Sequence, residues 1–255
     1  MSQSVDVVIL AGGAGFGPSE DTNRAMIPVA GKAMLQWEVD ALKGSGLVSR
    51  VYAVGDVTAD GLDEAIPPTS DFLGNMVAGV SRAAENGARS VLIATCDIPL
   101  VTSEGIDDFV GRALETGADF CYPVIPMERC VECYPEMRRT YLKLKEGVFS
   151  GGNMVLVSVD FVLRNRDVIL MAYQARKQPL RLAGLIGWGV LARVLAAQFV
   201  CRAAVDITAL ESAVSRMLGG KVRAVITQYA EIGEDVDKPE DLAAVERVFG
   251  SRERE

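Results

Sequence analysis

The chain has 255 residues, with 26 Lys and Arg against 34 Asp and Glu, a net charge of −8 and a hydrophobic fraction of 49%. At roughly 100–200 residues per domain, this length corresponds to one large domain or two small ones, and the hydrophobic fraction excludes a disordered chain. The net negative charge disfavours a nucleic-acid-binding protein, because phosphate backbones select a basic surface. A local basic pocket for a small polyphosphate is compatible with this charge.

Short apolar runs alternate with amphipathic segments through the first half of the chain. Four runs predict buried strands: Val5–Leu10, Val51–Val54, Val91–Thr95 and Phe120–Val124. Between them, apolar residues at helical spacing predict three helices, marked by Leu35, Val39 and Leu42, by Met76, Val77, Val80 and Ala84, and by Ile106, Phe109, Val110, Ala113 and Leu114. This order predicts a parallel sheet with right-handed crossovers.

The second half of the chain is less regular. Tyr141–Leu144, Met154–Val157 and Val222–Ile226 read as strands, and residues 159–218 as a helical region. A closing helix begins at Pro239, a favoured first helical position, and Ser251–Glu255 is expected to be a frayed tail. We therefore predict one α/β domain over residues 1–250, with a Rossmann-like, mostly parallel sheet flanked by helices and an elaborated C-terminal half.

One uncharged stretch, Leu182–Ala192, is too short to cross a bilayer, which needs about 20 apolar residues. We expect a buried or interface helix there, and a membrane-surface helix is the alternative. Its alternation of large apolar residues with glycine favours a homodimer contact or an apolar wall for an acceptor over a plain core helix.

The composition also bears on chemistry and location. The chain has no histidine, which excludes Ser-His-Asp and Cys-His catalysis and histidine-ligated metals. Its five cysteines are an odd number scattered along the chain, which suits a reducing compartment, and its start lacks the pattern of a signal peptide. We expect a cytoplasmic protein whose chemistry depends on carboxylates, Lys and Arg, backbone amides and a metal held by oxygen.

A glycine-rich segment, Leu10–Gly17, follows the first predicted strand. Glycines at the carboxyl end of a strand let backbone N–H groups approach a phosphate, although a flexible surface loop is the alternative. Two familiar phosphate-binding motifs fail here, because Pro18 stands where a dinucleotide fingerprint needs glycine and where a Walker A motif needs lysine. Its place after the first strand of a parallel sheet favours a phosphate-binding loop.

Three charged positions could act with this loop. Arg24 follows it closely and can neutralise a triphosphate, unless it is a solvated surface arginine. Asp97 ends a central strand and is suited to bind Mg²⁺, which uses one or two carboxylates plus substrate phosphates, unless it only shapes a turn. Asp237 lies in an acidic segment before the last helix and either supplies a second carboxylate or belongs to a helix cap.

Together these segments resemble the MobA-like NTP transferases of the sugar-nucleotidyltransferase superfamily. The family pattern of a strand, L-A-G-G-x-G, a basic residue and L-x-P-x-x-G-K is matched by Leu10–Gly15, Arg24 and Ile27–Lys32. The central glycine element, the aspartate-proline metal motif and the closing D-x-D-x-P-E-D-L are matched by Gly74–Gly79, Asp97–Leu100 and Asp235–Leu242. Gly17 stands in place of the family's usual arginine, Arg24 in place of its lysine, and Ala33 in place of a proline.

The resemblance implies transfer of a nucleoside monophosphate from an NTP to a phosphorylated small-molecule acceptor, with release of pyrophosphate. It implies an NTP-binding half at about residues 1–125 and an acceptor-binding half at about 126–250. It assigns Mg²⁺ to Asp97 and Asp237, and catalysis to Asp97 and Arg24. The implied nucleotide-binding residues are Leu10, Ala11, Gly12, Gly13, Ala14, Gly15, Arg24, Gly74 and Asn75, and the implied acceptor-binding residues are Gly151, Gly152 and Asn153. The alternative is a nucleotide-binding regulatory protein of the same fold without turnover.

Overall fold

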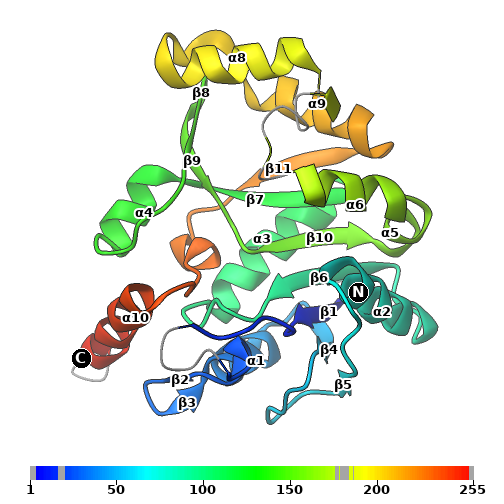
Figure 1. Ribbon diagram of the computed structural model, residues 1–255, viewed down its shortest axis with the longest axis vertical. Coiled ribbons are helices and arrows are strands. Elements are labelled where there is room, and N and C mark those ends of the chain that lie inside the picture. The colour runs from blue at the N-terminus through cyan, green and yellow to red at the C-terminus, as the bar shows by residue number, and fades with distance from the viewer. Residues whose placement is uncertain (1–3, 17–20, 176–177, 179–183, 186, 253–255) are drawn as a thin grey trace.

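The computed structural model describes residues 4–16, 21–175, 178, 184–185 and 187–252. A single mixed sheet runs through most of its length (Figure 1). Side by side, its strands are β5 (Glu64–Ile66), β4 (Val48–Val54), β1 (Val5–Leu10), β6 (Ser90–Thr95), β10 (Met154–Ser158), β7 (Phe120–Pro126), β9 (Gly147–Gly151) and β8 (Leu142–Leu144), with β11 (Val222–Ile226) also paired to β7.

The strand directions confirm the expected mostly parallel sheet. Strands β5, β4, β1 and β6 pair in parallel, and β11 is parallel to β7. The difference is β10, which lies antiparallel between β6 and β7. After β7 the chain forms the β8–β9 hairpin, whose second strand pairs antiparallel with the end of β7. The chain therefore enters the sheet again from the end at which β7 finished, and β10 must run the other way.

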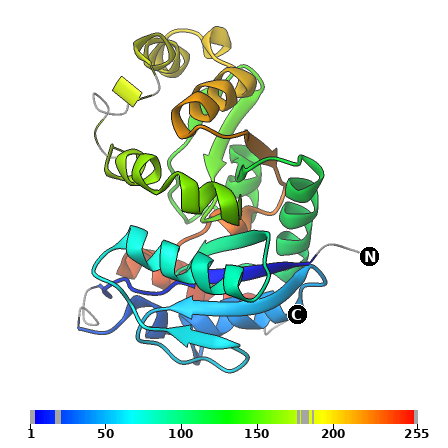
Figure 2. The same ribbon diagram turned by 90° about the vertical axis from the view of Figure 1, so that its right-hand side faces the viewer.

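Helices cover both faces of the sheet (Figures 1 and 2). They are α1 (Met34–Gly44), α2 (Phe72–Glu85), α3 (Ser103–Glu115), α4 (Met127–Cys133), α5 (Val159–Arg164), α6 (Arg166–Ala175), α8 (Trp188–Phe199), α9 (Ile207–Leu218) and α10 (Pro239–Arg252). Short elements are the 3₁₀ turns η2 (Arg24–Met26), η3 (Arg202–Ala204) and η4 (Ala230–Gly233), and the hairpin of β2 (Pro28–Val29) and β3 (Lys32–Ala33).

The core lies on both sides of β1, every residue of which is buried. Val7 and Ile9 pack in the cluster that contains α1 and α3, whereas Val8 and Leu10 pack in the cluster that contains α2 and α5. Alternate residues of a strand point to opposite faces, and the apolar residues 7–10 fill both, whereas the buried Asp6 carboxylate pairs with Arg50. The prediction of a doubly covered strand at Val5–Leu10 is confirmed.

Gly79 allows α2 to lie close to β1. A Cβ on Gly79 would lie 2.3 Å from a methyl group of Val8, within the core. We expect Gly79→Ala to destabilise the protein by about 1–3 kcal/mol through overpacking, although alanine favours helix. Gly111 in α3 is the matched control, because a Cβ there meets Leu47 at an ordinary 3.6 Å. In urea unfolding, Gly111→Ala should leave the free energy of unfolding unchanged or raise it. Equal effects of the two substitutions would contradict the close packing of α2 on β1.

The ends of α3 and α10 are fixed by identifiable residues. Thr102 caps α3 by accepting a hydrogen bond from the Gly105 amide. Helix α10 begins at Pro239, as predicted. The frayed tail was predicted too early, since α10 continues to Arg252. The hydroxyl of Ser251 donates to the carbonyls of Arg247 and Val248, and the Arg252 guanidinium lies over the Phe249 ring. Residues 253–255 lie outside the described chain.

The apolar stretch Leu182–Ala192 lies partly outside the described residues, which include Gly184, Leu185 and the start of α8. Trp188 is 63% exposed, and α8 has one buried residue, Ala197. The described part is therefore not a core helix. Within the described chain, no helix is long and apolar enough to cross a membrane. A homodimer contact through this segment stays a prediction.

Candidate active site

The glycine-rich loop begins directly after β1. Ala11 is fully buried, and its carbonyl accepts a 2.7 Å hydrogen bond from the Asn23 side chain. Gly12, Gly13 and Ala14 are exposed. The Arg24 amide donates to the Gly13 carbonyl, which ties the loop to the segment that follows it. The predicted loop thus presents exposed backbone at the carboxyl end of β1, while Gly17 and Pro18 lie outside the described residues.

Arg24 points away from bulk solvent and into a group of carboxylates. Its guanidinium donates to Asp97 Oδ2 at 2.9 Å and to Asp237 Oδ1. Its Nε lies 3.3 Å from the Ala14 carbonyl, within the glycine-rich loop. The interpretation as a solvated surface arginine is therefore wrong, because this side chain joins the loop to two acidic residues from distant parts of the sequence.

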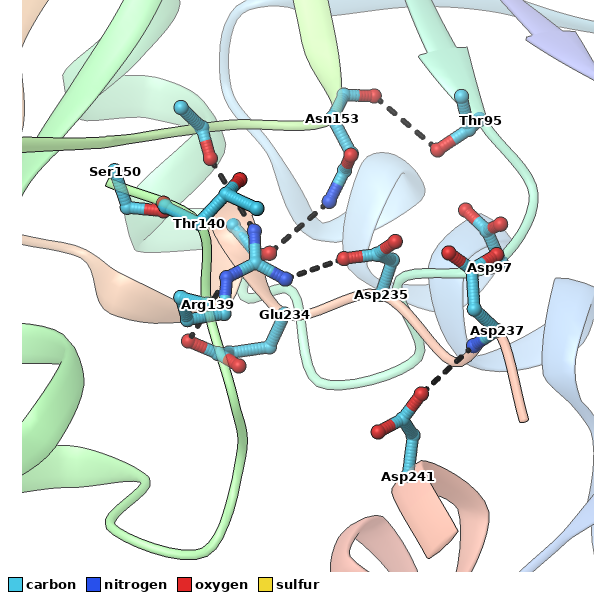
Figure 3. A network of polar contacts seen from close by, with 12 residues as sticks. Thr95, Asp97, Arg139, Thr140, Ser150, Asn153, Glu234, Asp235, Asp237 and Asp241 are labelled. Carbon is cyan, nitrogen blue, oxygen red and sulfur yellow. Dashed lines mark hydrogen bonds and ion pairs between the residues drawn. The ribbon is translucent and has the colours of Figure 1, made fainter. Parts of the chain in front are cut away.

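Three carboxylates converge at the carboxyl end of β6. Asp97, Asp235 and Asp237 each place an oxygen within 4.8 Å of the others (Figure 3). The backbone explains this convergence, because the Val236 amide donates to the Asp97 carbonyl at 2.9 Å, and the aspartates on either side of Val236 then lie next to Asp97. The Asp237 amide in turn donates to an Asp241 carboxylate oxygen at 3.2 Å. We call Asp97, Asp235 and Asp237 the acidic cluster.

The acidic cluster suits a hard divalent cation. Its side-chain exposure rises from 12% at Asp97 to 60% at Asp237, so the group reaches from the protein interior to solvent. Asp97 Oδ1 is buried and has no hydrogen-bond partner among the described residues. A buried carboxylate oxygen without a partner costs free energy, which a cation would offset. Carboxylates without histidine or thiolate are the ligands that Mg²⁺ prefers.

More ionisable groups lie behind the acidic cluster than the sequence indicated. Burial raises the pKa of Asp97, and the hydrogen bond from Arg24 opposes part of this rise. Burial also raises the pKa of Glu38 well above its ordinary value, and the nearby Asp97 carboxylate adds to it. Arg139 pairs with Asp235 and lies 3.8 Å from Glu234, which is fully buried (Figure 3). A buried layer of ionisable side chains, Glu38, Arg139 and Glu234, therefore lies behind the acidic cluster.

Glu234 makes stability depend on pH. Burial raises its pKa to about 7, from an ordinary 4.5, so the folded state binds this proton more tightly than the unfolded state does. Stability should therefore fall as pH rises through this window, by up to about 1.4 kcal/mol per pH unit. We expect Glu234→Gln to remove this loss. The free energy of unfolding of the variant minus that of the wild type, measured in urea, should therefore be larger at pH 8 than at pH 5. An equal difference at both pH values would contradict the assignment.

Gly74 and Asn75 lie at the start of α2, beside the loop. A Cβ on Gly12 would lie 2.8 Å from the Asn75 amide nitrogen, so the two residues are in close contact. The Asn75 side-chain oxygen accepts hydrogen bonds from the amide and hydroxyl of Thr69. A Cβ on Gly74 would lie 2.2 Å from the Thr69 hydroxyl oxygen. The structure thus brings Asn75 to the loop, whereas Gly74 packs against Thr69 and Asp71.

Gly151, Gly152 and Asn153 connect β9 to β10 next to the acidic cluster. A Cβ on Gly152 would lie within 2.8 Å of side chains of Pro123 and Ile232, so close packing requires glycine there. The Asn153 amide nitrogen donates to the Gly233 carbonyl at 3.1 Å (Figure 3). These contacts hold the segment that leads into Asp235, which gives Asn153 a positioning role that the sequence did not indicate.

Four ionisable residues of this site were given no definite role from the sequence. Asp235 lies in the same segment as Asp237, and the D-x-D spacing was a usable signal. Glu38 was a weaker signal, being a carboxylate on the apolar face of α1 between Leu35 and Leu42. The sequence left open whether Arg139 faces the acceptor or water, and the burial of Arg139 and Glu234 follows only from the tertiary structure.

Comparison with known proteins now identifies the family. Residues 7–199 match the model of the MobA-like NTP transferase domain. The chain belongs to this family. Its match spans most of the chain and includes the loop, Arg24, Asp97 and the turn at Gly151–Asn153. The predicted resemblance is confirmed.

Individual relatives agree with the family. A hypothetical transferase from Thermus thermophilus superposes with a TM-score of 0.79 at 32% identity, over 94% of this chain and 100% of that one. CMP:2-keto-3-deoxy-manno-octonic acid synthetase, in a complex with CTP, superposes with a TM-score of 0.60 at 12% identity, over 98% of this chain and 100% of that one. At that identity it shows the fold alone, which is that of nucleotide-diphospho-sugar transferases.

Among curated proteins, the bifunctional protein GlmU of Lactobacillus gasseri is 32% identical over 119 residues, 44% of this chain and 26% of GlmU. GlmU of Geobacter metallireducens is 30% identical over 121 residues, 44% of this chain and 25% of that protein. The chain thus matches about a quarter of the length of these relatives.

Proposed function

We propose that the protein transfers a nucleoside monophosphate from an NTP to a phosphorylated small-molecule acceptor and releases pyrophosphate. The observation that carries this proposal is the acidic cluster, joined by Arg24 to the exposed glycine-rich loop and containing an Asp97 oxygen that has no hydrogen-bond partner within the described part of the chain. The CTP complex of the synthetase with the same fold supports a nucleotide as one substrate.

The proposed roles follow from these positions. The backbone at Gly12–Ala14 and the Arg24 guanidinium bind the β- and γ-phosphates, while Gly74 and Asn75 lie against the base. Asp97, Asp235 and Asp237 would hold Mg²⁺, which when bound neutralises charge on the reacting phosphates. Most of the nucleotide contacts come from residues 1–125, whereas residues 126–250 supply the acceptor side and two of the three metal carboxylates.

In the proposed reaction an oxygen of the acceptor phosphate attacks the α-phosphorus. The bond from the α-phosphorus to its bridging oxygen breaks, and pyrophosphate leaves. A phosphate monoester has a second pKa of about 6 and is largely ionised at pH 7, so no protein base is required. Catalysis then consists of positioning and charge stabilisation, which is compatible with a chain without histidine.

The test is pyrophosphate release measured across the four NTPs, with Mg²⁺ and a panel of phosphorylated acceptors. We expect release that depends on both the metal and an acceptor. Nucleotide binding without release under any combination would contradict transfer and favour a regulatory protein that retains the fold.

A further inference from the structure

A largely apolar cavity of about 480 Å³ lies between the sheet and α9, in the acceptor half. Strands β7, β8, β9 and β11 form one wall, and α9 forms the other. The main apolar contacts come from Phe120, Tyr122, Leu144, Phe149, Leu210 and Val214. A cavity of this size and lining is typical of a site for a small molecule with an apolar body.

One end of this cavity is linked to the acidic cluster through Arg139. Gly151 lines the cavity, and its carbonyl accepts a 3.3 Å hydrogen bond from Arg139, which also pairs with Asp235. The Tyr122 hydroxyl lies at Gly151 as well, 2.1 Å from the position that a Cβ would take. Thr140 and Ser150 also line this end, where Figure 3 shows them beside Arg139, and the Ser150 hydroxyl donates to the Thr140 carbonyl. A molecule in the cavity would therefore have its polar end on the side of Arg139 and the acidic cluster.

The rest of the cavity lining has few side chains that could form hydrogen bonds with a polar ligand. Two charged side chains line the cavity, Glu211 and Arg223, and they pair with each other at 3.4 Å. Glu211 also accepts a hydrogen bond from the Ala224 amide. A sugar ring buried here would lose its hydrogen bonds to water without replacing most of them, which costs free energy for each hydroxyl group. An aliphatic body gains about 25 cal/mol per Å² of apolar surface that it buries.

We infer that the acceptor is a monophosphate ester with an aliphatic body, of the alkyl or isoprenoid class, whose chain lies in this cavity and whose phosphate lies at the acidic cluster. This inference rests on the proposed transfer reaction. The phosphate dianion of the ester bonds to the α-phosphorus of the NTP, pyrophosphate leaves with the electrons of the broken bond, and the product is a nucleoside diphosphate ester of the aliphatic alcohol.

The test compares geranyl monophosphate with glucose 1-phosphate as acceptors in the pyrophosphate-release assay. We expect kcat/KM for geranyl monophosphate to be at least tenfold higher. Leu210→Glu places a carboxylate in the cavity and should raise the KM for geranyl monophosphate at least tenfold, with little change in NTP affinity. Ser212→Glu adds the same charge on the exposed side of α9 and should change neither value.

The outcomes separate the inference from the reaction on which it rests. Release with glucose 1-phosphate but not with geranyl monophosphate would overturn the aliphatic acceptor and leave nucleotidyl transfer standing. If no acceptor supports release, calorimetry with geranyl monophosphate tests whether the cavity binds this compound, independently of any reaction. Binding that Leu210→Glu weakens and Ser212→Glu does not would support the cavity as an aliphatic phosphate site, and absence of binding would overturn it.

Discussion

Asp97→Asn is expected to lower the rate of pyrophosphate release by about 10²–10³-fold and to leave the protein folded. Asp97 is the most buried member of the acidic cluster, and one of its oxygens has no partner among the described residues. Asparagine keeps the shape and a hydrogen-bond acceptor for Arg24 but removes the charge that a metal ion requires. The measurement is kcat at saturating NTP and Mg²⁺, with thermal unfolding to confirm the fold.

Asp160→Asn is the control for this substitution, because it removes one negative charge from an exposed carboxylate paired with Arg164. We expect wild-type kcat for that variant. An Asp97→Asn protein that keeps more than about a tenth of the wild-type rate would contradict the assignment of Asp97 as a metal ligand.

Arg24→Ala is expected to change two binding constants in opposite directions. The guanidinium interacts with Asp97, with Asp237 and with the Ala14 carbonyl of the loop. Its loss removes a cation from the triphosphate site and should weaken NTP binding about 10–100-fold, the effect of losing charged hydrogen bonds. The same loss removes the positive charge that neutralises the acidic cluster, so Mn²⁺ alone should bind more tightly.

Calorimetric titrations with NTP and with Mn²⁺ separate these two effects. Arg164→Ala removes an exposed arginine distant in sequence and should change neither constant. NTP affinity should also fall with added salt in the wild type, less so in Arg24→Ala. Unchanged NTP affinity in Arg24→Ala would mean that the triphosphate binds elsewhere, and unchanged Mn²⁺ affinity would mean that the guanidinium does not compete with a cation.

The fold was largely predictable because the sequences of its central strands have strong local apolar patterns. The run Val5–Leu10, apolar apart from Asp6, gave β1 with both ends correct, and the apolar stripe of α3 gave that helix. Strands β5 and β9 were missed, since β5 has three residues and β9 begins and ends with glycine. The direction of β10 was also beyond local reasoning, because it depends on where the β8–β9 hairpin returns the chain.

The site was predictable where its residues follow strands or lie in motifs. Asp97, Arg24 and Asp237 come together as expected, although 213 positions separate Arg24 from Asp237 in the sequence. The buried layer was not predictable, because an arginine beside a surface-exposed neighbour in the sequence gives no sign of burial. Arg138 is exposed, whereas the side chain of Arg139 is 11% exposed and pairs with Asp235.

The most direct test of the account is a crystal structure with Mn²⁺ and a non-hydrolysable NTP analogue, with the metal located by its anomalous scattering. We expect a peak bound by carboxylate oxygens of the acidic cluster, Asp97, Asp235 and Asp237, with the triphosphate on the loop at Gly12–Ala14 and Arg24 turned from the carboxylates to the phosphates. A peak away from these carboxylates, or Arg24 still bridging Asp97 and Asp237 with the nucleotide bound, would contradict it.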